Sequence, residues 1–294
     1  MEVPGRYLGR LGADPVYDAD IPGVEVESWR RIEPPKQRYE QFGGLVALNA
    51  EGYLAVVTGT MERVAASQRD GVRRAADLIT AALREGGVVQ AFGTGHSEAL
   101  TMEVAGRAGG LVPTNRIALR DLVLYGGAPA DILGPTLERD PTVARRLYEL
   151  APVDPRDIFV IASNSGVNGT IVEFAIVVKE HGHQLIAITS REHSAGVESR
   201  HPSGRKLSDL ADVVLDNGAP YGDAALPLPG GGAVGAISSI TAALLAQQIT
   251  VEVVARMLEA GEQPPVYLSA NIPDGDEHNK ALEARYAGRI RRGS

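Results

Sequence analysis

The sequence predicts an α/β protein, a three-layer αβα sandwich built on a doubly wound, five-stranded parallel sheet. Apolar runs such as VVQAF, DIFVIAS and QLIAITS alternate with helix-like stretches, at a spacing typical of parallel sheets. Two of these runs lead into glycine- and serine-rich turns that precede a helix. The chain has 294 residues, 44% of them hydrophobic, which is enough to bury one large core.

The elements follow in a regular order. Residues 1–44, rich in proline and aromatic side chains, form an extended N-terminal arm that is either solvated or packed against its own domain or a partner. Residues 45–294 form a single domain that opens with two helices up to Leu83. We then expect strands at 88–92, 111–117, 157–163, 184–190 and 212–216, helices at 97–109, 142–151, 171–182 and 236–258, and a last helix from Glu277.

The stretches between these elements are polar or glycine-rich. We expect a proline-rich link between 117 and 142, a loop at 191–206, and a glycine-rich stretch at 228–235 before the long apolar helix.

Composition excludes several classes of protein. The formal net charge of −8 argues against a nucleic-acid partner, because such proteins carry a basic face. The chain has no cysteine, so disulfides and thiolate chemistry are excluded. No leader-like start and no run of about 18 apolar residues is found, which favours a cytoplasmic protein without a membrane partner. No motif requires a metal or a cofactor.

The first turn, Gly93-Thr94-Gly95-His96-Ser97, is typical of anion binding. Its glycines allow close approach of the backbone, and the helix start favours a negative charge. A dinucleotide fingerprint would need glycine where Glu98 stands, and no lysine of a P-loop follows. We therefore expect a phosphate at Gly95, His96 and Ser97.

The second turn, residues 163–170, has the same position between strand and helix. Its hydroxyl and amide side chains exceed what one helix cap needs. Because ligands of such sheets lie beyond the carboxyl ends of the strands, both turns should face one site. The predicted phosphate ligands here are Ser163, Asn164, Ser165 and Asn168.

The two turns together resemble the sugar isomerase (SIS) domain family, whose pattern is GxGxS after one strand and SxSGx(S/T) after a later one. Here they read GTGHS and SNSGVN, with Asn168 in place of the last hydroxyl. The resemblance covers roughly residues 69–258 and extends to the segments EVAGRAGG, TSREHS, RHPSG and GDEHN, as in SIS proteins described as phosphosugar isomerases. It implies a sugar phosphate ligand.

The resemblance also suggests catalytic residues. Sugar isomerases remove the C2 proton of the opened sugar, which requires a carboxylate or imidazole base. Glu103 and Arg107 have helical i, i+4 spacing and align with active-site positions of phosphoheptose isomerases, so Glu103 is the expected base and Arg107 its electrostatic partner. Glu98 is the alternative base. His193, after a strand, is the expected group for ring opening or proton transfer.

Further polar residues are weaker candidates for the site. Four of them stand near expected strand ends or helix starts, or in polar loops: Ser190, His201, Ser238 and His278. A surface position is expected for His201 and His278, and completion of a neighbouring subunit's site is the alternative for His278. His181 and His183 are expected to flank a helix end rather than bind metal.

Several functions remain open at this stage. Proton removal at C2 leads either to aldose–ketose isomerisation or to elimination, and related SIS enzymes acting on N-acetylglucosamine 6-phosphate would lose water. N-acetylmuramic acid 6-phosphate etherases are similar at both turns, but their catalytic glutamate aligns with Arg107. A phosphosugar sensor without catalysis is one alternative, and a serine hydrolase around the GxSxG-like segment Gly95–Ala99 is a remote one.

The long apolar helix at 236–258 is more hydrophobic than one exposed face requires. SIS domains commonly pair, so we expect a homodimer in which this helix, with the two helices before Leu83, forms the interface.

Overall fold

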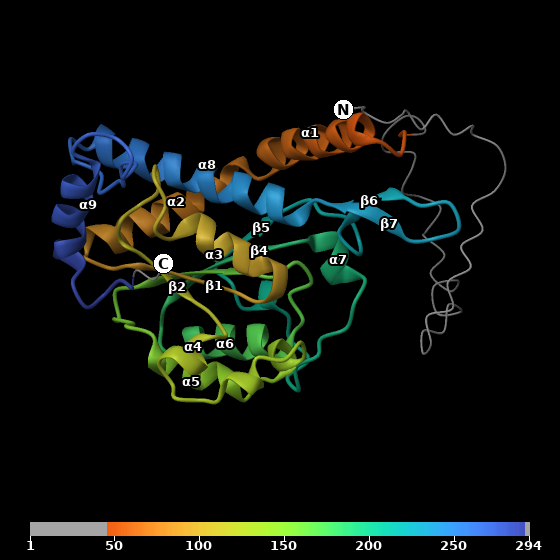
Figure 1. Cartoon of the computed structure of the whole chain (residues 1–294), viewed down its shortest axis with the longest axis horizontal. Coiled ribbons are helices and arrows are strands. Elements are labelled where there is room, and N and C mark those ends of the chain that lie inside the picture. Colours follow the sequence, from red (N-terminus) through yellow and green to blue (C-terminus); the bar gives the residue numbers. More distant parts are fainter. Residues whose placement is uncertain (1–45, 292–294) are drawn as a thin grey trace, which may run out of the picture.

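The computed structural model describes residues 46–291, so the predicted arm lies outside the described residues. A parallel sheet forms the middle of the domain (Figure 1). Its strands are β1 (Val89–Gly93), β2 (Thr114–Ile117), β3 (Ile158–Ala162), β4 (Gln184–Thr189) and β5 (Val213–Asp216), in the order β2-β1-β3-β4-β5. All neighbouring pairs are parallel, and the predicted fold class is confirmed.

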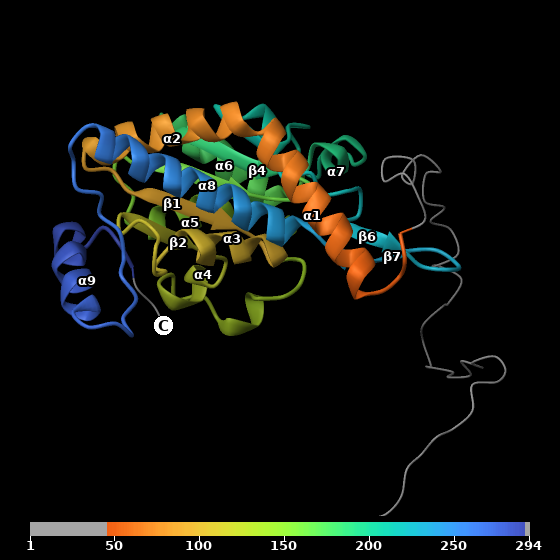
Figure 2. The same ribbon diagram turned by 90° about the horizontal axis from the view of Figure 1, so that it is seen from above.

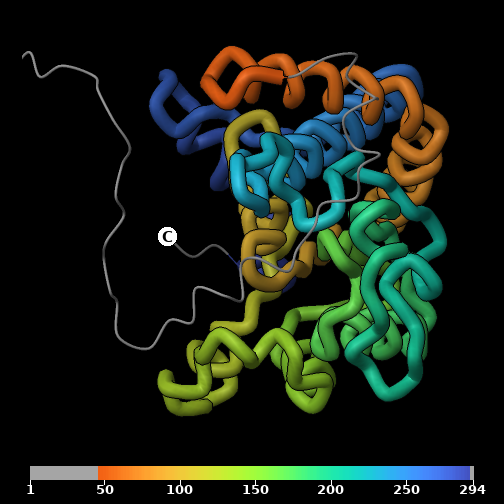
Figure 3. The backbone as a smooth tube through the Cα atoms, turned by 90° about the vertical axis from the view of Figure 1, so that its right-hand side faces the viewer, coloured from red at the N-terminus to blue at the C-terminus, as the bar shows by residue number. Residues whose placement is uncertain are grey.

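Helices cover both faces of this sheet. One layer contains α2 (Arg69–Arg84), α3 (Glu98–Val104) and α8 (Ser238–Glu259), while α1 (Ala50–Ser67) continues it beyond the sheet. The opposite layer contains α4 (Asp121–Leu124), α5 (Val143–Leu150) and α6 (Gly169–Glu180). Figure 3 shows the two layers from the side, the orange and blue helices above and the yellow-green helices below.

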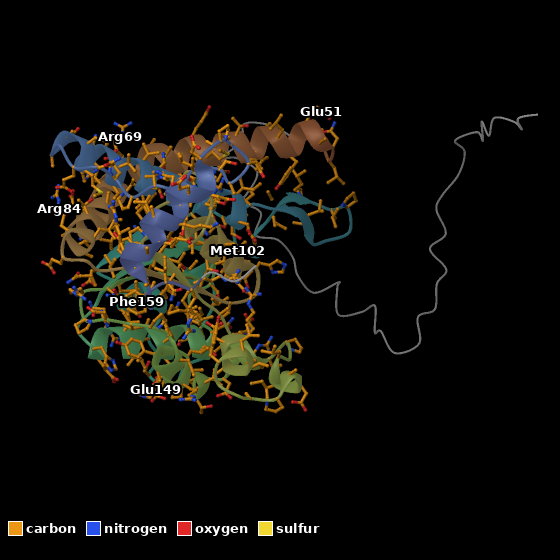
Figure 4. The ribbon with its side chains drawn as sticks, turned by 60° about the vertical axis from the view of Figure 1, so that its left-hand side comes forward. Glu51, Arg69, Arg84, Met102, Glu149 and Phe159 are labelled. Carbon is orange, nitrogen blue, oxygen red and sulfur yellow. The ribbon has the colours of Figure 1, made fainter. Side chains whose placement is uncertain are left out.

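The strands are buried on both sides, and their side chains alternate between two cores. In β3, Ile158 and Val160 face the core under α2 and α8, whereas Phe159 and Ile161 face the core under α5 and α6. Figure 4 shows Phe159 inside the molecule and Glu149, on α5, at its outer surface. The continuous apolar runs of the sequence therefore reflect a sheet covered on both faces.

At the amino edge of the sheet, one buried carboxylate ties the C-terminal segment to the strands. Asp157 accepts hydrogen bonds from the Val88 amide at 2.8 Å, the Gln90 amide group at 2.9 Å and the Arg289 guanidinium at 2.5 Å. The Asn115 side chain donates to Gln90 and accepts from the Arg291 amide. Residues 288–291 thus close the edge opposite the predicted site.

The glycine-rich stretch is not an irregular loop, which corrects the expectation for 228–235. It is the tip and second strand of an antiparallel hairpin, β6 (Ala224–Pro227) and β7 (Ala233–Ala236), which packs beside α1 (Figure 2). The Tyr53 hydroxyl donates to the Ala236 carbonyl at 2.5 Å. The strand could not be predicted from this glycine-rich sequence, because glycine weakens the alternation of side chains that marks strands.

Two further boundaries differ from the expectation. The helix predicted at 97–109 ends at Val104, because Gly106 and Gly109 adopt left-handed φ angles of +79° and +78° and the Gly109 amide donates to the Tyr267 carbonyl. The predicted loop at 191–206 begins with a short helix, α7 (Arg191–Ala195).

The last helix, α9, spans Gly275–Glu283, and the short 3-10 turns are η4 (Gly95–Ser97), η5 (Ala130–Ile132), η6 (Leu137–Arg139), η7 (Leu207–Asp209) and η8 (Ala284–Tyr286).

The long helix α8 lies against α2 and α3 (Figures 1 and 2). Its inner side, with Leu245, Ile249 and Val253, belongs to the core, while Val251 on the outer side is 66% exposed. Within residues 46–291, α8 is also the one helix whose length and composition would suffice to cross a membrane, a test that helices lining a protein core also pass.

Candidate functional site

The first turn follows β1 at the carboxyl edge of the sheet. Gly93 comes so close to the turn that a Cβ there would lie 2.5 Å from the Ser97 carbonyl oxygen, and Gly95 has a left-handed φ of +55°. The Ser97 amide donates to the Thr94 carbonyl at 3.1 Å. Glycine at these positions lets the chain fold back at once into η4 and α3, and Ser97 is left half-buried.

The second turn follows β3, the neighbour of β1. The buried Ser163 hydroxyl accepts from the Gly166 amide at 3.1 Å, and Gly166 has a φ of +69°. The Ser163 amide donates to Ile188 in β4. Asn168, at the first position before α6, accepts from the Arg200 guanidinium at 3.2 Å and makes no cap hydrogen bond. The turn is thus fixed by its own side chains and by β4.

The two turns open into opposite helical layers. The helix after β1, α3, packs against α8, whereas the helix after β3, α6, packs against α5 on the other face. The carboxyl ends of β1 and β3 therefore border the topological switch point of the sheet, where ligands of doubly wound proteins bind. This location follows from the strand order β2-β1-β3-β4-β5.

A small hollow joins parts of both turns to the start of α8. Its polar lining comes from four separate segments of the chain, and the rest of its lining is apolar. The lining residues are His96, Ser97, Leu100, Ala162, Asn164, Ile188, Asn217, Ser238, Ser239 and Ala242. Of the predicted phosphate ligands, the hollow brings together His96, Ser97 and Asn164. The others are in the same two turns but do not line it: Gly95, Ser163, Ser165 and Asn168.

Sequence reasoning missed Asn217 and Ser239. The Asn217 side chain donates to the Asn164 side chain at 3.1 Å, which orients the Asn164 amide beside Ser97. Asn217 directly follows β5, so the rule that placed both turns at the carboxyl edge also applies to it. Ser239 carries no such signal, because only the folding of α8 across the edge brings it to the hollow.

The start of α8 is already occupied by a carboxylate. Asp223, with a left-handed φ of +68°, accepts from the Ser238 hydroxyl at 2.7 Å, the Ser238 amide at 2.8 Å and the Ile237 amide at 3.2 Å. The carboxylate complements the positive end of the helix. Ser238, a weaker candidate from sequence, is thus both a wall of the hollow and a partner of Asp223.

Glu103 and Arg107 form the predicted pair, although Arg107 lies after α3 and not on it. The Glu103 carboxylate accepts from the Arg107 guanidinium and, at 2.6 Å, from the Gln247 amide group on α8. Gln247 is five residues beyond Ala242, about 7.5 Å along the helix. Glu103 therefore lies between α3 and α8, beside the hollow but outside its lining. The alternative base, Glu98, pairs with Arg120 at 3.1 Å.

His193 lies in α7, past the end of β4. Its Nδ1 accepts from the Gly222 amide at 3.1 Å and lies 3.4 Å from the Asn164 amide nitrogen, which joins it to the second turn. Ser190 positions this helix: its hydroxyl accepts from the His193 amide and donates to the Ala219 carbonyl. A neutral ring that accepts at Nδ1 carries its proton at Nε2.

The other histidines hold the fold together. The His201 side chain is 8% exposed and bonds Glu173 on α6 at 3.0 Å, so it is not the surface histidine expected. His278 Nε2 approaches the Val266 carbonyl at 3.1 Å. His183 is buried between the Tyr148 hydroxyl and the Asp157 carbonyl, and burial lowers its pKa. His181 caps α6 and stacks on Tyr148.

Comparison with known proteins identifies the family. The family model of the SIS domain matches residues 52–190. A UPF0309 protein of Geobacillus kaustophilus is 37% identical over 81% of this chain and 94% of its own length. A UPF0309 protein of Listeria monocytogenes is 42% identical over 78% of this chain and 93% of its own length.

Among solved structures, a phosphoheptose isomerase from Neisseria gonorrhoeae is similar with a TM-score of 0.47 and 17% identity, over 70% of this chain and 96% of that one. The relatives match over nearly their full length, and the segment that matches the SIS domain contains both turns that border the switch point. This chain belongs to the UPF0309 family of SIS-domain proteins.

Proposed function

We propose that this protein binds a hexose or hexosamine 6-phosphate, of the N-acetylglucosamine 6-phosphate type, at the switch point and removes its C2 proton. The observation that carries the proposal is the pair of turns on adjacent strands, from which Ser97 and Asn164 reach one hollow. Hydroxyl and amide groups stabilise a phosphate without a metal. Since the protein has a net charge of −8, the phosphate has to be held by such local donors.

The proposed chemistry needs a base for C2 and a group that assists ring opening. Glu103 is the proposed base, with the Arg107 guanidinium as its electrostatic partner and Gln247 as an orienting donor. His193, which carries its proton on Nε2 when Nδ1 accepts, is the proposed group for opening the ring. The enediolate of a 2-hydroxy sugar then becomes a ketose, whereas the enolate of a 2-acetamido sugar expels the C3 hydroxyl, which leaves as water once it is protonated.

Proton NMR in deuterated water, with a panel of hexose and hexosamine 6-phosphates, tests this function. We expect loss of the C2 proton signal for at least one sugar, and the final spectrum distinguishes a ketose from an unsaturated sugar. Glu103→Gln should lower the exchange about 10²–10⁴-fold, the range for loss of a general base. Sugar phosphate binding without any exchange in the wild-type protein would identify a sensor and refute the enzyme.

The proposed phosphate site has its own test. Ser97→Ala removes a hydroxyl that lines the hollow, and a hydrogen bond to a charged group contributes about 1.5–3 kcal/mol. We expect affinity for the sugar phosphate to fall about 10- to 100-fold in calorimetry. The control is Ser67→Ala, at the end of α1, whose hydroxyl donates to the Val64 carbonyl, accepts from the Gln68 side-chain amide and does not line the hollow. An unchanged affinity in Ser97→Ala would show that the first turn does not bind the phosphate through the Ser97 hydroxyl.

We further propose a cytoplasmic homodimer. A sugar phosphate enzyme works where its charged substrate is made, and the outer side of α8 presents large apolar side chains, Val251 at 66% and Leu258 at 59% exposure. A second copy would cover them.

A further inference from the structure

Glu138 lies against the first turn, although no sequence motif includes it in the site. It belongs to η6, in the link before α5, and is half-buried. A Cβ built on Gly95 would lie 3.1 Å from Glu138 Oε2 and 4.0 Å from its Cδ. One carboxylate oxygen therefore lies beside the Cα of Gly95, the glycine that turns the chain toward Ser97.

The backbone around Glu138 is anchored to the second turn. The buried Thr170 hydroxyl contacts the carbonyls of Leu137, at 3.1 Å, and Asp140, at 2.6 Å, on either side of Glu138. Gly169 fits so closely that a Cβ there would be 2.2 Å from the Arg139 carbonyl oxygen. Glu138 is thus held between the turn after β1 and the start of α6, in the crevice of the switch point.

Other carboxylates at this edge of the sheet are engaged. Glu98 pairs with Arg120, Asp223 holds the start of α8, and Glu192 accepts from the Tyr221 amide. Within residues 46–291, the Glu138 carboxylate takes part in no hydrogen bond or ion pair. Its oxygens remain available to accept from a ligand in the crevice.

A carboxylate cannot face a bound phosphate, because like charges at contact distance repel. If Ser97 and Asn164 bind the phosphate in the hollow, which Glu138 does not line, Glu138 faces the uncharged part of the ligand, the sugar hydroxyls. Conversion of an aldose to a ketose also needs a group at these hydroxyls, since a proton has to move from O2 to O1 as well as from C2 to C1. In the proposed function His193 opens the ring, and Glu103 acts at carbon, which leaves this transfer between the oxygens to another group.

We propose that Glu138 is a second catalytic residue, which relays the proton between O2 and O1 of a 2-hydroxy aldose phosphate. This inference rests on the proposed function. After Glu103 takes the C2 proton, the Glu138 carboxylate accepts the O2 proton of the enediolate and delivers it to O1. Protonated Glu103 then returns its proton to C1, the C2 carbonyl forms, and both carboxylates end as they began.

The test separates the two proton transfers. In deuterated water, with the 2-hydroxy aldose 6-phosphate that the wild-type protein isomerises, Glu138→Gln should slow ketose formation about 10²–10⁴-fold. Exchange at C2 should continue, because that step uses Glu103. The matched control is Asp131→Asn, an exposed carboxylate in η5 of the same link, which should leave both rates unchanged.

Three outcomes would overturn the relay. Ketose formation at the wild-type rate in Glu138→Gln would exclude a catalytic role. Equal loss of exchange and of ketose, with sugar phosphate binding retained, would place Glu138 at the carbon step instead. Exchange by the wild-type protein confined to 2-acetamido sugars, which lack O2, would also refute it. In each case, sugar phosphate binding and C2 proton exchange by the wild-type protein still support the proposed function. The proposed function itself would fail only if the wild-type protein showed no such binding or exchange.

Discussion

At the scale of single residues, Gly93 decides whether the first turn can form. A methyl group there would meet the Ser97 carbonyl oxygen at 2.5 Å and the Ala162 carbonyl oxygen at 3.3 Å, and both belong to rigid backbone. We expect Gly93→Ala to lower the free energy of unfolding by about 1–3 kcal/mol and to abolish sugar phosphate binding. Urea denaturation and calorimetry measure the two effects. Gly59→Ala in α1, whose nearest neighbour would be 3.7 Å away, should leave binding intact.

His183 makes stability depend on pH. Burial lowers its pKa from the ordinary value of 6.5. Above that value the ring is neutral in the folded and unfolded states, whereas below it the unfolded state binds a proton that the folded state resists. The free energy of unfolding should therefore fall as pH decreases through 6.5 toward the lower folded-state pKa.

Urea denaturation across this pH range checks the prediction. His183→Asn, which loses the contacts to Tyr148 and Asp157 and is therefore less stable throughout, should show a smaller loss on acidification. His96→Asn, at an exposed position, should keep the wild-type slope. An equal slope in all three proteins would contradict the role of His183.

At the scale of elements, residues 288–291 close the amino edge of the sheet, an arrangement that the sequence did not predict. The Asp157 side chain is fully buried, and Arg289 reaches it over 132 positions of sequence. Removing one partner of a buried ion pair costs about 3–5 kcal/mol, because the other charge stays in the interior. We expect Arg289→Ala to lower the free energy of unfolding by that order in urea denaturation, whereas Arg285→Ala, at an exposed position, should have little effect.

Some elements of the fold could be predicted from the sequence and others could not. The five strands and the two turns carry strong local patterns, apolar runs and glycines at fixed positions, so their succession along the chain and the place of both turns at the carboxyl edge could be predicted. The hairpin β6–β7 and the early end of α3 could not, because glycines removed the pattern in one and a distant contact with Tyr267 set the other. Ser239 and Glu138 come to the crevice through tertiary packing, and the sequence around Glu138 carries no motif.

At the scale of the whole molecule, the outer side of α8 determines the expected assembly. Val251→Glu would place a charge in the middle of the proposed interface, where its desolvation is unfavourable. We expect this variant to have the mass of one chain in light scattering, and the wild-type protein that of two. Leu124→Glu, an equally exposed apolar position on α4 in the opposite layer, should stay a dimer. A wild-type mass of one chain would refute the homodimer.

Asp223 sets a further expectation for the sugar phosphate that we propose as the ligand. Its carboxylate takes the amides at the start of α8, beside the hollow that Ser238 and Ser239 line. A second phosphoryl group at the far end of a sugar would meet this fixed negative charge in place of free amides. Sugars phosphorylated at both ends should therefore bind more weakly than the monophosphates in competition experiments. Asp223→Asn should reduce this difference in affinity between bisphosphates and monophosphates.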